Sequence, residues 1–166
     1  MLFRSVGARI AADGHSLVSG GGRTSMMGAV ARAARAGGAH TLGVIPEQLV
    51  PLEVADTDAD ELIVVRGMRE RKRIMEDSSD GFIALPGGIG TMEELFEVWT
   101  THSLGMLGKP VVVLDTDGFY APLWAFVESL HDRGFVRTAA LRALHRAASI
   151  DEAFEVFDLS AKDVPA

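Results

Sequence analysis

Residues Phe82–Trp99 have the sequence FIALPGGIGTMEELFEVW, and this stretch decides the fold expected for the whole chain. Its first four residues are apolar and predict a short buried strand. Three glycines in the Pro86–Gly90 turn let the backbone adopt positive φ angles and leave room for a ligand to approach the main chain. A helix follows, because the next apolar residues have helical spacing: Met92, Leu95, Phe96 and Trp99. This order of strand, glycine turn and helix N-terminus predicts a phosphate-binding site.

Glu94 has two interpretations at this point. Thr91 opens the expected helix and Glu94 follows it by three residues, which is the spacing of a capping box. In a capping box the acidic side chain accepts a hydrogen bond from the main-chain N–H of the cap residue. A carboxylate in this place could equally take part in catalysis. The turn by itself leaves both interpretations open.

Length and composition narrow the class of protein. A chain of 166 residues predicts one domain over residues 1–166, with residues 158–166 as a frayed tail. The absence of cysteine excludes disulfides and thiolate chemistry and fits a cytoplasmic protein, and the five histidines lack metal-ligand spacing. The net charge of −7 argues against nucleic acid as a partner, because binding its phosphates needs a basic surface. No apolar run is long enough to cross a bilayer, so we expect no membrane partner.

Short apolar strands alternate with helices along the chain. Strands are expected near residues 15–19, 41–45, 62–65, 82–85 and 111–115, and helices near residues 2–12, 24–36, 68–78, 91–99, 123–130 and 151–157. This alternation predicts an α/β protein with a Rossmann-like, doubly wound parallel sheet and helices on both faces. In such sheets ligands bind at the carboxyl ends of strands, where both glycine turns, residues 20–22 and 86–90, would lie. Neither turn has the Gly-x-Gly-x-x-Gly spacing, so a nucleotide with one phosphate is at least as well supported as a dinucleotide.

One helix of this acidic protein is strongly basic. Met68 and Met75 mark its apolar stripe, and Arg71 and Lys72 lie between them at helical spacing, on the side that faces the protein. The other arginines of this helix fall on another face and are expected in solvent. An arginine on a buried face needs an anionic partner, either a structural carboxylate or a substrate phosphate.

Two segments resemble the paired signatures of the LONELY GUY family. Met68–Lys72 matches Met-x-x-Arg-Lys, and Pro86–Glu94 matches Pro-Gly-Gly-x-Gly-Thr-x-x-Glu. The two motifs together are much more specific than either glycine turn alone. The resemblance covers nearly the whole chain and includes the triple glycine at residues 20–22, the Gly43–Pro46 segment and Lys109–Val111.

The resemblance implies a hydrolase that acts on N-glycosyl bonds. Members of this family are phosphoribohydrolases, in which water cleaves cytokinin riboside 5′-monophosphates, and by extension AMP, to the free base and ribose 5-phosphate. No cofactor is implied, and members are dimers or larger homo-oligomers with sites completed across the interface. Family members have also been labelled lysine decarboxylases, but the three lysines here, Lys72, Lys109 and Lys162, have no recognisable pyridoxal-phosphate context.

The same resemblance assigns the site residue by residue. Arg71 and Glu94 match the positions regarded as catalytic. The substrate-binding positions match Gly21, Gly22, Glu53, Lys72, Gly88, Ile89, Gly90, Thr91, Glu93 and Thr100. We expect main-chain N–H groups of Gly88 and Gly90 and the Thr91 hydroxyl to bind the 5′-phosphate. Glu94 would contact the ribose and either activate water or stabilise the cationic sugar, and Arg71 would position Glu94 or the ribose phosphate.

Two departures from the family pattern concern the start of the chain. Ser25 occupies a position where family members usually have glycine. The family also begins with a strand and a Cys-Gly-Ser-type loop, whereas this sequence begins with the helix that follows them. Either the start is assigned too late or the sheet forms without that strand, so we expect a sheet lacking the first strand of the family.

Two other classes of protein stay open. A Rossmann-like carrier of the molybdenum-cofactor type would hold a phosphorylated cofactor without turnover, and it would not need Arg71 and Glu94 together. A single-stranded nucleic-acid binder is disfavoured by the charge of −7 and the 7% aromatic content. Either core packing or a dimer interface would explain a further set of apolar residues: Leu95, Phe96, Trp99, Leu104, Met106 and Leu107.

Overall fold

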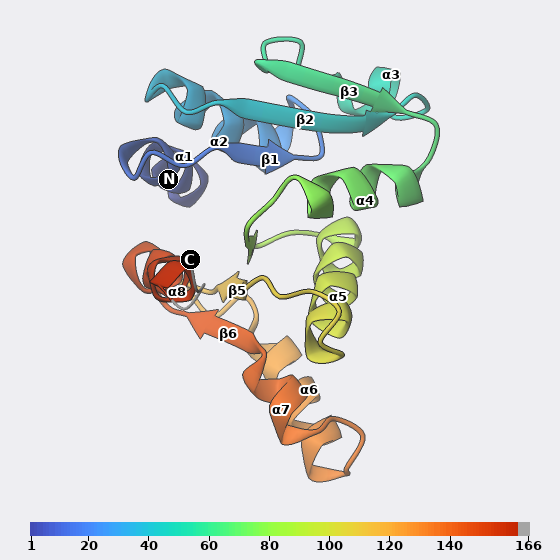
Figure 1. The fold of residues 1–166 in the computed structure, drawn as a ribbon, viewed down its shortest axis with the longest axis vertical. Helices are drawn as coiled ribbons and strands as arrows, with labels where there is room; N and C mark the ends of the chain where they lie inside the picture. The colour runs from blue at the N-terminus through green and yellow to red at the C-terminus, as the bar shows by residue number, and fades with distance from the viewer. Residues whose placement is uncertain (163–166) are drawn as a thin grey trace. The chain divides into compact units, whose positions relative to one another are not determined.

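The computed structural model of the protein describes residues 1–162, and the side chains of residues 1–52 and 54–157. Helices alternate with strands along the chain (Figure 1). The strands are β1 Leu17–Ser19, β2 Thr41–Pro46, β3 Glu61–Val65, β4 Phe82–Ala84, β5 Val111–Leu114 and β6 Leu144–Ala147. The helices are α1 Leu2–Ala12, α2 Ser25–Ala36, α3 Val50–Glu53, α4 Met68–Asp77, α5 Ile89–Ser103, α6 Ala121–Asp132, α7 Thr138–Arg142 and α8 Ile150–Lys162. Within the described range, none of these helices is long and apolar enough to span a bilayer.

The strands form two parallel sheets, one in each of two compact units. The first unit, Met1–Ser79, has the strand order β1-β2-β3, and the second, which begins at Asp80, has the order β4-β5-β6. The pairings within both sheets are parallel. The predicted α/β class with parallel strands is therefore confirmed. The doubly wound sheet that we expected is present as two three-stranded sheets, and the organisation as one domain stays a prediction.

In the first unit, β2 is the central strand and carries the core. Its residues Val44 and Ile45 are fully buried. α2 packs on β1 and β2, and α1, the first element of the described chain, packs on α2. Val6 and Ile10 of α1 and Val30 of α2 are buried. α4 packs on β2 and β3, so the basic helix lies directly beside the central strand.

The core of the second unit is built around β5. All four residues of Val111–Leu114 are fully buried, because β5 lies between β4 and β6. α5 packs on β4 and β5, and α8 packs on β5 and β6. Leu95 and Trp99 of α5 and Trp124 of α6 belong to this core, and the Trp99 indole N–H donates to the Ala140 carbonyl oxygen at 2.7 Å. Core packing, not a dimer surface, therefore accounts for Leu95 and Trp99.

The sequence does not predict α7 and β6, which complete the second unit. In β6, Leu144 and Ala147 are buried at the two ends, while His145 and Arg146 between them are exposed. This pattern has neither the alternation nor the continuous apolar run by which a strand is recognised. α8 also extends to Lys162, beyond the expected end near residue 157, and residues 163–166 of the expected tail lie outside the described residues.

Ser25, the first residue of α2, has a left-handed backbone conformation with a φ of 55°. This conformation costs a residue with a side chain about 1–2 kcal/mol, whereas glycine adopts it readily. The cost gives a physical reason for the glycine that is usual here in the family that the sequence resembles. Ser25 is therefore a strained position three residues after the first glycine turn.

Replacing Ser25 by Gly is expected to raise the free energy of unfolding by about 0.5–1 kcal/mol, because the strain is relieved while the unfolded chain becomes more flexible. Ala29→Gly in the same helix is the matched control and should lower that free energy by about 0.5–1 kcal/mol, since glycine is unfavourable in a helix interior. Urea unfolding followed by circular dichroism measures both changes. A Ser25→Gly protein that is less stable than the parent would contradict the strain at this position.

Candidate functional site

The second glycine turn connects β4 to α5, as the sequence predicts. Gly88 is the N-cap of α5, and Ile89, Gly90 and Thr91 are its first three residues. The turn does not use the positive φ angles that its glycines allow, because Gly88 has a φ of −91° and neither Gly88 nor Gly90 is among the glycines with positive φ. A Cβ atom at either position would have no heavy atom within 4 Å. The two glycines therefore leave the main chain open to a ligand without an unusual conformation.

Glu94 does not cap this helix. Thr91 is the third residue of α5 and not its cap, and the N-cap makes no side-chain hydrogen bond. The capping-box interpretation is therefore wrong, since it requires the cap to lie three residues before the acidic side chain. Glu94 is half-buried on α5, whereas Glu93, Ile89 and Thr100 are exposed. The catalytic role expected for Glu94 stays a prediction.

Arg71 of α4 is buried in the first unit, with 5% of its surface exposed. Its Nε atom donates to the carbonyl oxygen of Val44 at 3.1 Å, and its Nη2 atom donates to that of Gly20 at 3.2 Å. A Cβ atom on residue 20 would lie 1.7 Å from Nη2, so glycine is needed there to admit the guanidinium. The prediction that Arg71 faces the protein is confirmed. These two bonds use neutral carbonyls, and the anionic partner expected for Arg71 stays a prediction.

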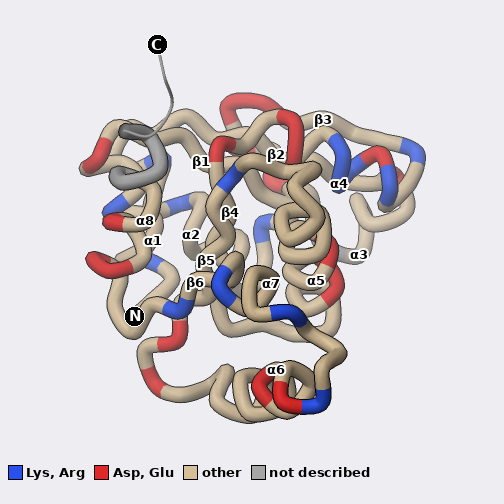
Figure 2. The backbone as a smooth tube through the Cα atoms, turned by 60° about the horizontal axis from the view of Figure 1, so that its bottom comes forward, with Lys and Arg blue, Asp and Glu red and all other residues tan. Residues whose placement is uncertain are grey.

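The remaining basic residues of α4 follow the predicted helix phase. Lys72 is half-buried beside Arg71, while Arg69 and Arg73 are exposed. Figure 2 shows these basic residues along α4, interrupted by acidic ones. The charged side chains on one side of α4 are therefore exposed to solvent, while the Arg71 guanidinium on the other side is buried in the first unit.

The first glycine turn is paired with the acidic loop, residues 46–60, that follows β2. The main-chain N–H of Asp56 donates to the Gly21 carbonyl oxygen at 2.8 Å, and an isolated antiparallel bridge joins Gly22 to Ala55. Gly21 has a φ of 72°, a conformation that glycine adopts without strain. Glu53 ends α3 just before this pairing, and its side chain lies outside the described residues. The loop that carries Glu53 is therefore hydrogen-bonded to Gly21 and Gly22, and all three are predicted substrate contacts.

A buried ion pair that the sequence does not predict holds the acidic loop. Asp56 is 4% exposed, and Arg35 of α2 donates to both of its carboxylate oxygens, at 2.9 and 3.1 Å. Arg35 also donates to the Thr41 hydroxyl at 3.3 Å. The Thr41 hydroxyl and main-chain N–H both donate to Asp60 at 2.8 Å, and these bonds, the hydroxyl's first, hold the pKa of Asp60 below its ordinary value. Among five acidic residues in one loop, nothing local marks Asp56 as the buried one.

The predicted site residues form two groups. Gly21, Gly22 and Arg71 lie around the carboxyl ends of β1 and β2, with Gly20 in contact with the guanidinium. Gly88–Glu94 occupy the N-terminal end of α5, and Thr100 lies two turns further along that helix. Arg71 belongs to the first unit and Glu94 to the second, and their meeting in one site stays a prediction.

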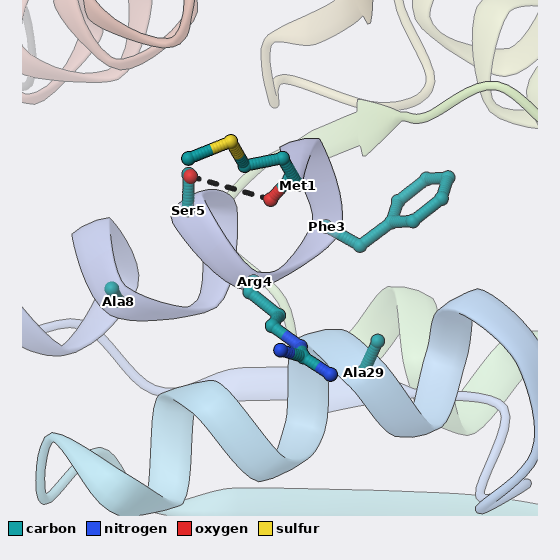
Figure 3. A pocket seen from close by; sticks show the side chains of 6 residues that line it. All are labelled: Met1, Phe3, Arg4, Ser5, Ala8 and Ala29. Atoms are coloured by element: carbon teal, nitrogen blue, oxygen red, sulfur yellow. Dashed lines mark hydrogen bonds between the residues drawn. The ribbon is translucent and has the colours of Figure 1, made fainter.

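A hollow along α1 and α2 is separate from these groups. Figure 3 shows the six residues that line it: Met1, Phe3, Arg4, Ser5, Ala8 and Ala29. The Ser5 hydroxyl donates to the Met1 carbonyl oxygen at 3.3 Å at one end of it. The lining is mostly apolar and includes none of the predicted site residues, so we do not assign the hollow to substrate.

Parallel α/β proteins with glycine turns at the carboxyl ends of strands, one of them opening a helix, form a class that typically binds nucleotide phosphates. Within this class, a family model described as "Possible lysine decarboxylase" matches residues 27–158. The chain is 51% identical over 154 residues to the cytokinin riboside 5′-monophosphate phosphoribohydrolase of Mycobacterium marinum, covering 93% of this chain and 82% of that protein. The protein of the same name from Mycobacterium tuberculosis is 54% identical over 143 residues, covering 86% and 76%. The chain therefore belongs to the LONELY GUY family.

Solved structures show the same fold at lower sequence identity. The molybdenum cofactor binding protein of Rippkaea orientalis has a TM-score of 0.71 and 24% identity, covering 95% of this chain and 84% of that one. The molybdenum cofactor carrier protein of Chlamydomonas reinhardtii has a TM-score of 0.71 and 25% identity, covering 97% and 86%. These likenesses establish the fold, which phosphoribohydrolases and carriers share.

Asp56→Asn is expected to lower the free energy of unfolding by about 2–3 kcal/mol, because it removes the charge that pairs with the partly buried Arg35. Asp58→Asn is the control, since Asp58 is exposed in the same loop and its replacement should change stability by less than about 0.5 kcal/mol. Urea unfolding at neutral pH measures both variants. Equal stabilities would mean that the ion pair does not hold the loop.

Proposed function

We propose that this protein is a phosphoribohydrolase that cleaves the N-glycosidic bond of cytokinin riboside 5′-monophosphates and of AMP. The products are the free adenine-type base and ribose 5-phosphate. The observation that carries the proposal is the identity of 51% and 54% to two mycobacterial proteins of this name over most of the chain. Water is the second substrate, and we assign no cofactor and no nucleic-acid partner.

In this proposal the 5′-phosphate binds at the N-terminus of α5. The first N–H groups of a helix have no partner within the helix, and the helix dipole favours an anion beside them. The open positions of Gly88 and Gly90 at the start of α5 support this placement. The Thr91 hydroxyl supplies one further donor.

Glu94 and Arg71 are the proposed catalytic pair. Cleavage of the N-glycosidic bond develops positive charge on the sugar, so a carboxylate beside the ribose lowers the barrier. Glu94, one turn beyond Thr91, either stabilises that charge or takes a proton from the attacking water. Arg71, held on two main-chain carbonyls, is a fixed cation that positions Glu94 or the ribose phosphate.

The other substrate contacts are assigned through the family motif. They are Gly21, Gly22, Glu53, Lys72, Ile89, Glu93 and Thr100. The pairing of the first glycine turn with the acidic loop supports a shared role for Gly21, Gly22 and Glu53, because it holds the main chains of the two segments next to each other.

The alternative is a carrier that binds a phosphorylated cofactor without turnover. The solved structures with a TM-score of 0.71 favour it at the level of the fold. At 24% and 25% identity, however, they share less with this chain than the phosphoribohydrolases do. A carrier has no need of a paired guanidinium and carboxylate, so turnover and its dependence on both residues separate the two functions.

Glu94→Gln and Arg71→Ala are each expected to lower kcat for AMP by about 10²–10⁴-fold, the range typical of lost acid–base or charge assistance. Glu97→Gln on α5 and Arg73→Ala on α4 are the matched controls, and they should keep the parent activity. Chromatography of free adenine measures turnover. Parent-like rates in both Glu94→Gln and Arg71→Ala would refute the assignment, and a parent that binds AMP but releases no base would favour the carrier.

We also propose that the enzyme is a cytoplasmic homodimer or larger homo-oligomer, with the C-terminal part of α5 and the residues after it at the interface. Phe96, Leu104 and Met106 are 38%, 67% and 76% exposed, whereas Leu107 packs partly buried against the core. Exposed apolar side chains in one chain segment favour association. Of the six apolar candidates, these three are the ones that core packing does not explain.

Leu104→Glu is therefore expected to convert the oligomer to monomer at micromolar concentration, because it places a charge in an apolar contact. Phe135→Glu is the control, since Phe135 is 77% exposed in the same unit but follows α6. Sedimentation velocity measures the association state of both. A monomeric parent, or dissociation by both replacements alike, would refute this interface.

A further inference from the structure

Tyr120 joins the chain segment after β5 to the turn after β4. Its hydroxyl donates to the carbonyl oxygen of Leu85 at 2.5 Å, at the short end of the range for such bonds. Leu85 is the residue directly before Pro86–Gly90. β4 and β5 are parallel with Ala84 beside Val113, so both connections leave from the same edge of the sheet. A residue outside the family motif therefore holds the entrance of the second glycine turn.

Tyr120 is itself held firmly. It is 2% exposed, and its main-chain N–H donates to Asp115 Oδ1 at 3.1 Å. The other oxygen of Asp115, a buried residue after β5, accepts a bond from Arg146 of β6 at 3.3 Å. Arg146, Asp115, Tyr120 and Leu85 thus form a chain of hydrogen bonds across the carboxyl ends of β6, β5 and β4. The bond to Asp115 holds the main chain of Tyr120, so its hydroxyl has little freedom to leave the Leu85 carbonyl.

The hydroxyl acts as a donor and not as a base. Burial, followed by the charge of Asp115, raises the pKa of Tyr120 to about 12, so the proton stays on the oxygen at neutral pH. The surrounding core is apolar, with Val113, Trp124 and Val127 among its members. Phenylalanine would fill the same space, so what tyrosine adds at this position is the bond to Leu85.

The Leu85 carbonyl is a sensitive point of the turn. Pro86 follows it and has no N–H, so this carbonyl is the one hydrogen-bonding group of the Leu85–Pro86 peptide. Because φ of proline is nearly constant, the orientation of this peptide sets the direction in which the turn leaves β4. Gly88, the N-cap of α5, comes two residues after Pro86. A change at Leu85 therefore displaces the main-chain N–H groups assigned to the phosphate.

We propose that Tyr120 is a positioning residue for phosphate binding, and that its hydroxyl keeps the Pro86–Gly90 turn in the conformation that receives the 5′-phosphate. The inference rests on the proposed function for the nature of the ligand. It predicts that phosphate-bearing ligands depend on the hydroxyl, whereas the free base does not, because the base makes no contact with these N–H groups.

Tyr120→Phe keeps the ring and removes only this bond. It should raise KM for AMP and the Kd for ribose 5-phosphate about tenfold, the size expected for one lost hydrogen bond, with kcat within about twofold of the parent. The Kd for adenine should stay unchanged. Isothermal titration calorimetry with ribose 5-phosphate and with adenine gives the two Kd values, and the adenine-release assay gives KM and kcat. Asp115→Asn, which weakens the anchor of Tyr120, should shift the same constants in the same direction by a smaller factor.

Trp99→Phe is the matched control. It removes another bond from an aromatic donor to a main-chain carbonyl in the same core, but that carbonyl belongs to Ala140 of α7. It should lower the urea midpoint at least as much as Tyr120→Phe, because it also removes part of a buried ring, and it should leave the ribose 5-phosphate affinity unchanged. Parent-like affinity in Tyr120→Phe, equal loss in Trp99→Phe, or a parent that binds no ribose 5-phosphate would overturn the positioning role. Tyrosine-dependent binding of ribose 5-phosphate without release of base from AMP would support that role and refute the hydrolase.

Discussion

Burial of a charged or polar group costs free energy unless the group finds hydrogen-bond partners, and this cost organises the ends of the strands in both units. Arg71 reaches the carbonyls of Gly20 and Val44, and Asp56 pairs with Arg35. In the second unit, Asp115 holds Tyr120 through its main-chain N–H. These bonds lie near the ends of the parallel strands or in the segments that follow them. The bonds that satisfy the buried polar atoms therefore also hold the glycine turns and the acidic loop in place.

The two glycine turns use glycine for different physical reasons. In the first, the space beside Gly20 is occupied by the Arg71 guanidinium, and the acidic loop closes over Gly21 and Gly22. In the second, Gly88 and Gly90 face open space at the start of a helix. One turn is therefore filled by the protein itself, and the other keeps its main chain available for a ligand. The glycine pattern in the sequence does not distinguish these uses, because both need only the absence of a Cβ atom.

The fold and the chemistry are supported by different observations. The α/β fold is common to phosphoribohydrolases and molybdenum cofactor carriers, so a TM-score of 0.71 describes the scaffold and not the reaction. The chemistry rests on identity to named phosphoribohydrolases and on the motif pair of Arg71 and Glu94. The structure decides one of the two interpretations of Glu94, since the start of α5 at Ile89 excludes the capping box.

Much of this protein could be predicted from local patterns in the sequence. These patterns predicted the alternation of strands and helices, both glycine turns, the inward-facing position of Arg71 and the family. These features depend on residues a few positions apart, where helical and strand periods act. The sequence could not determine β6, the φ angles of the second turn, or the bonds that brace the turns. Arg35 and Asp56 are 21 residues apart, Tyr120 and Leu85 are 35 apart, and Arg71 and Gly20 are 51 apart. Such partners are selected only when the chain has folded, because a buried donor takes whichever acceptor the tertiary packing brings within reach.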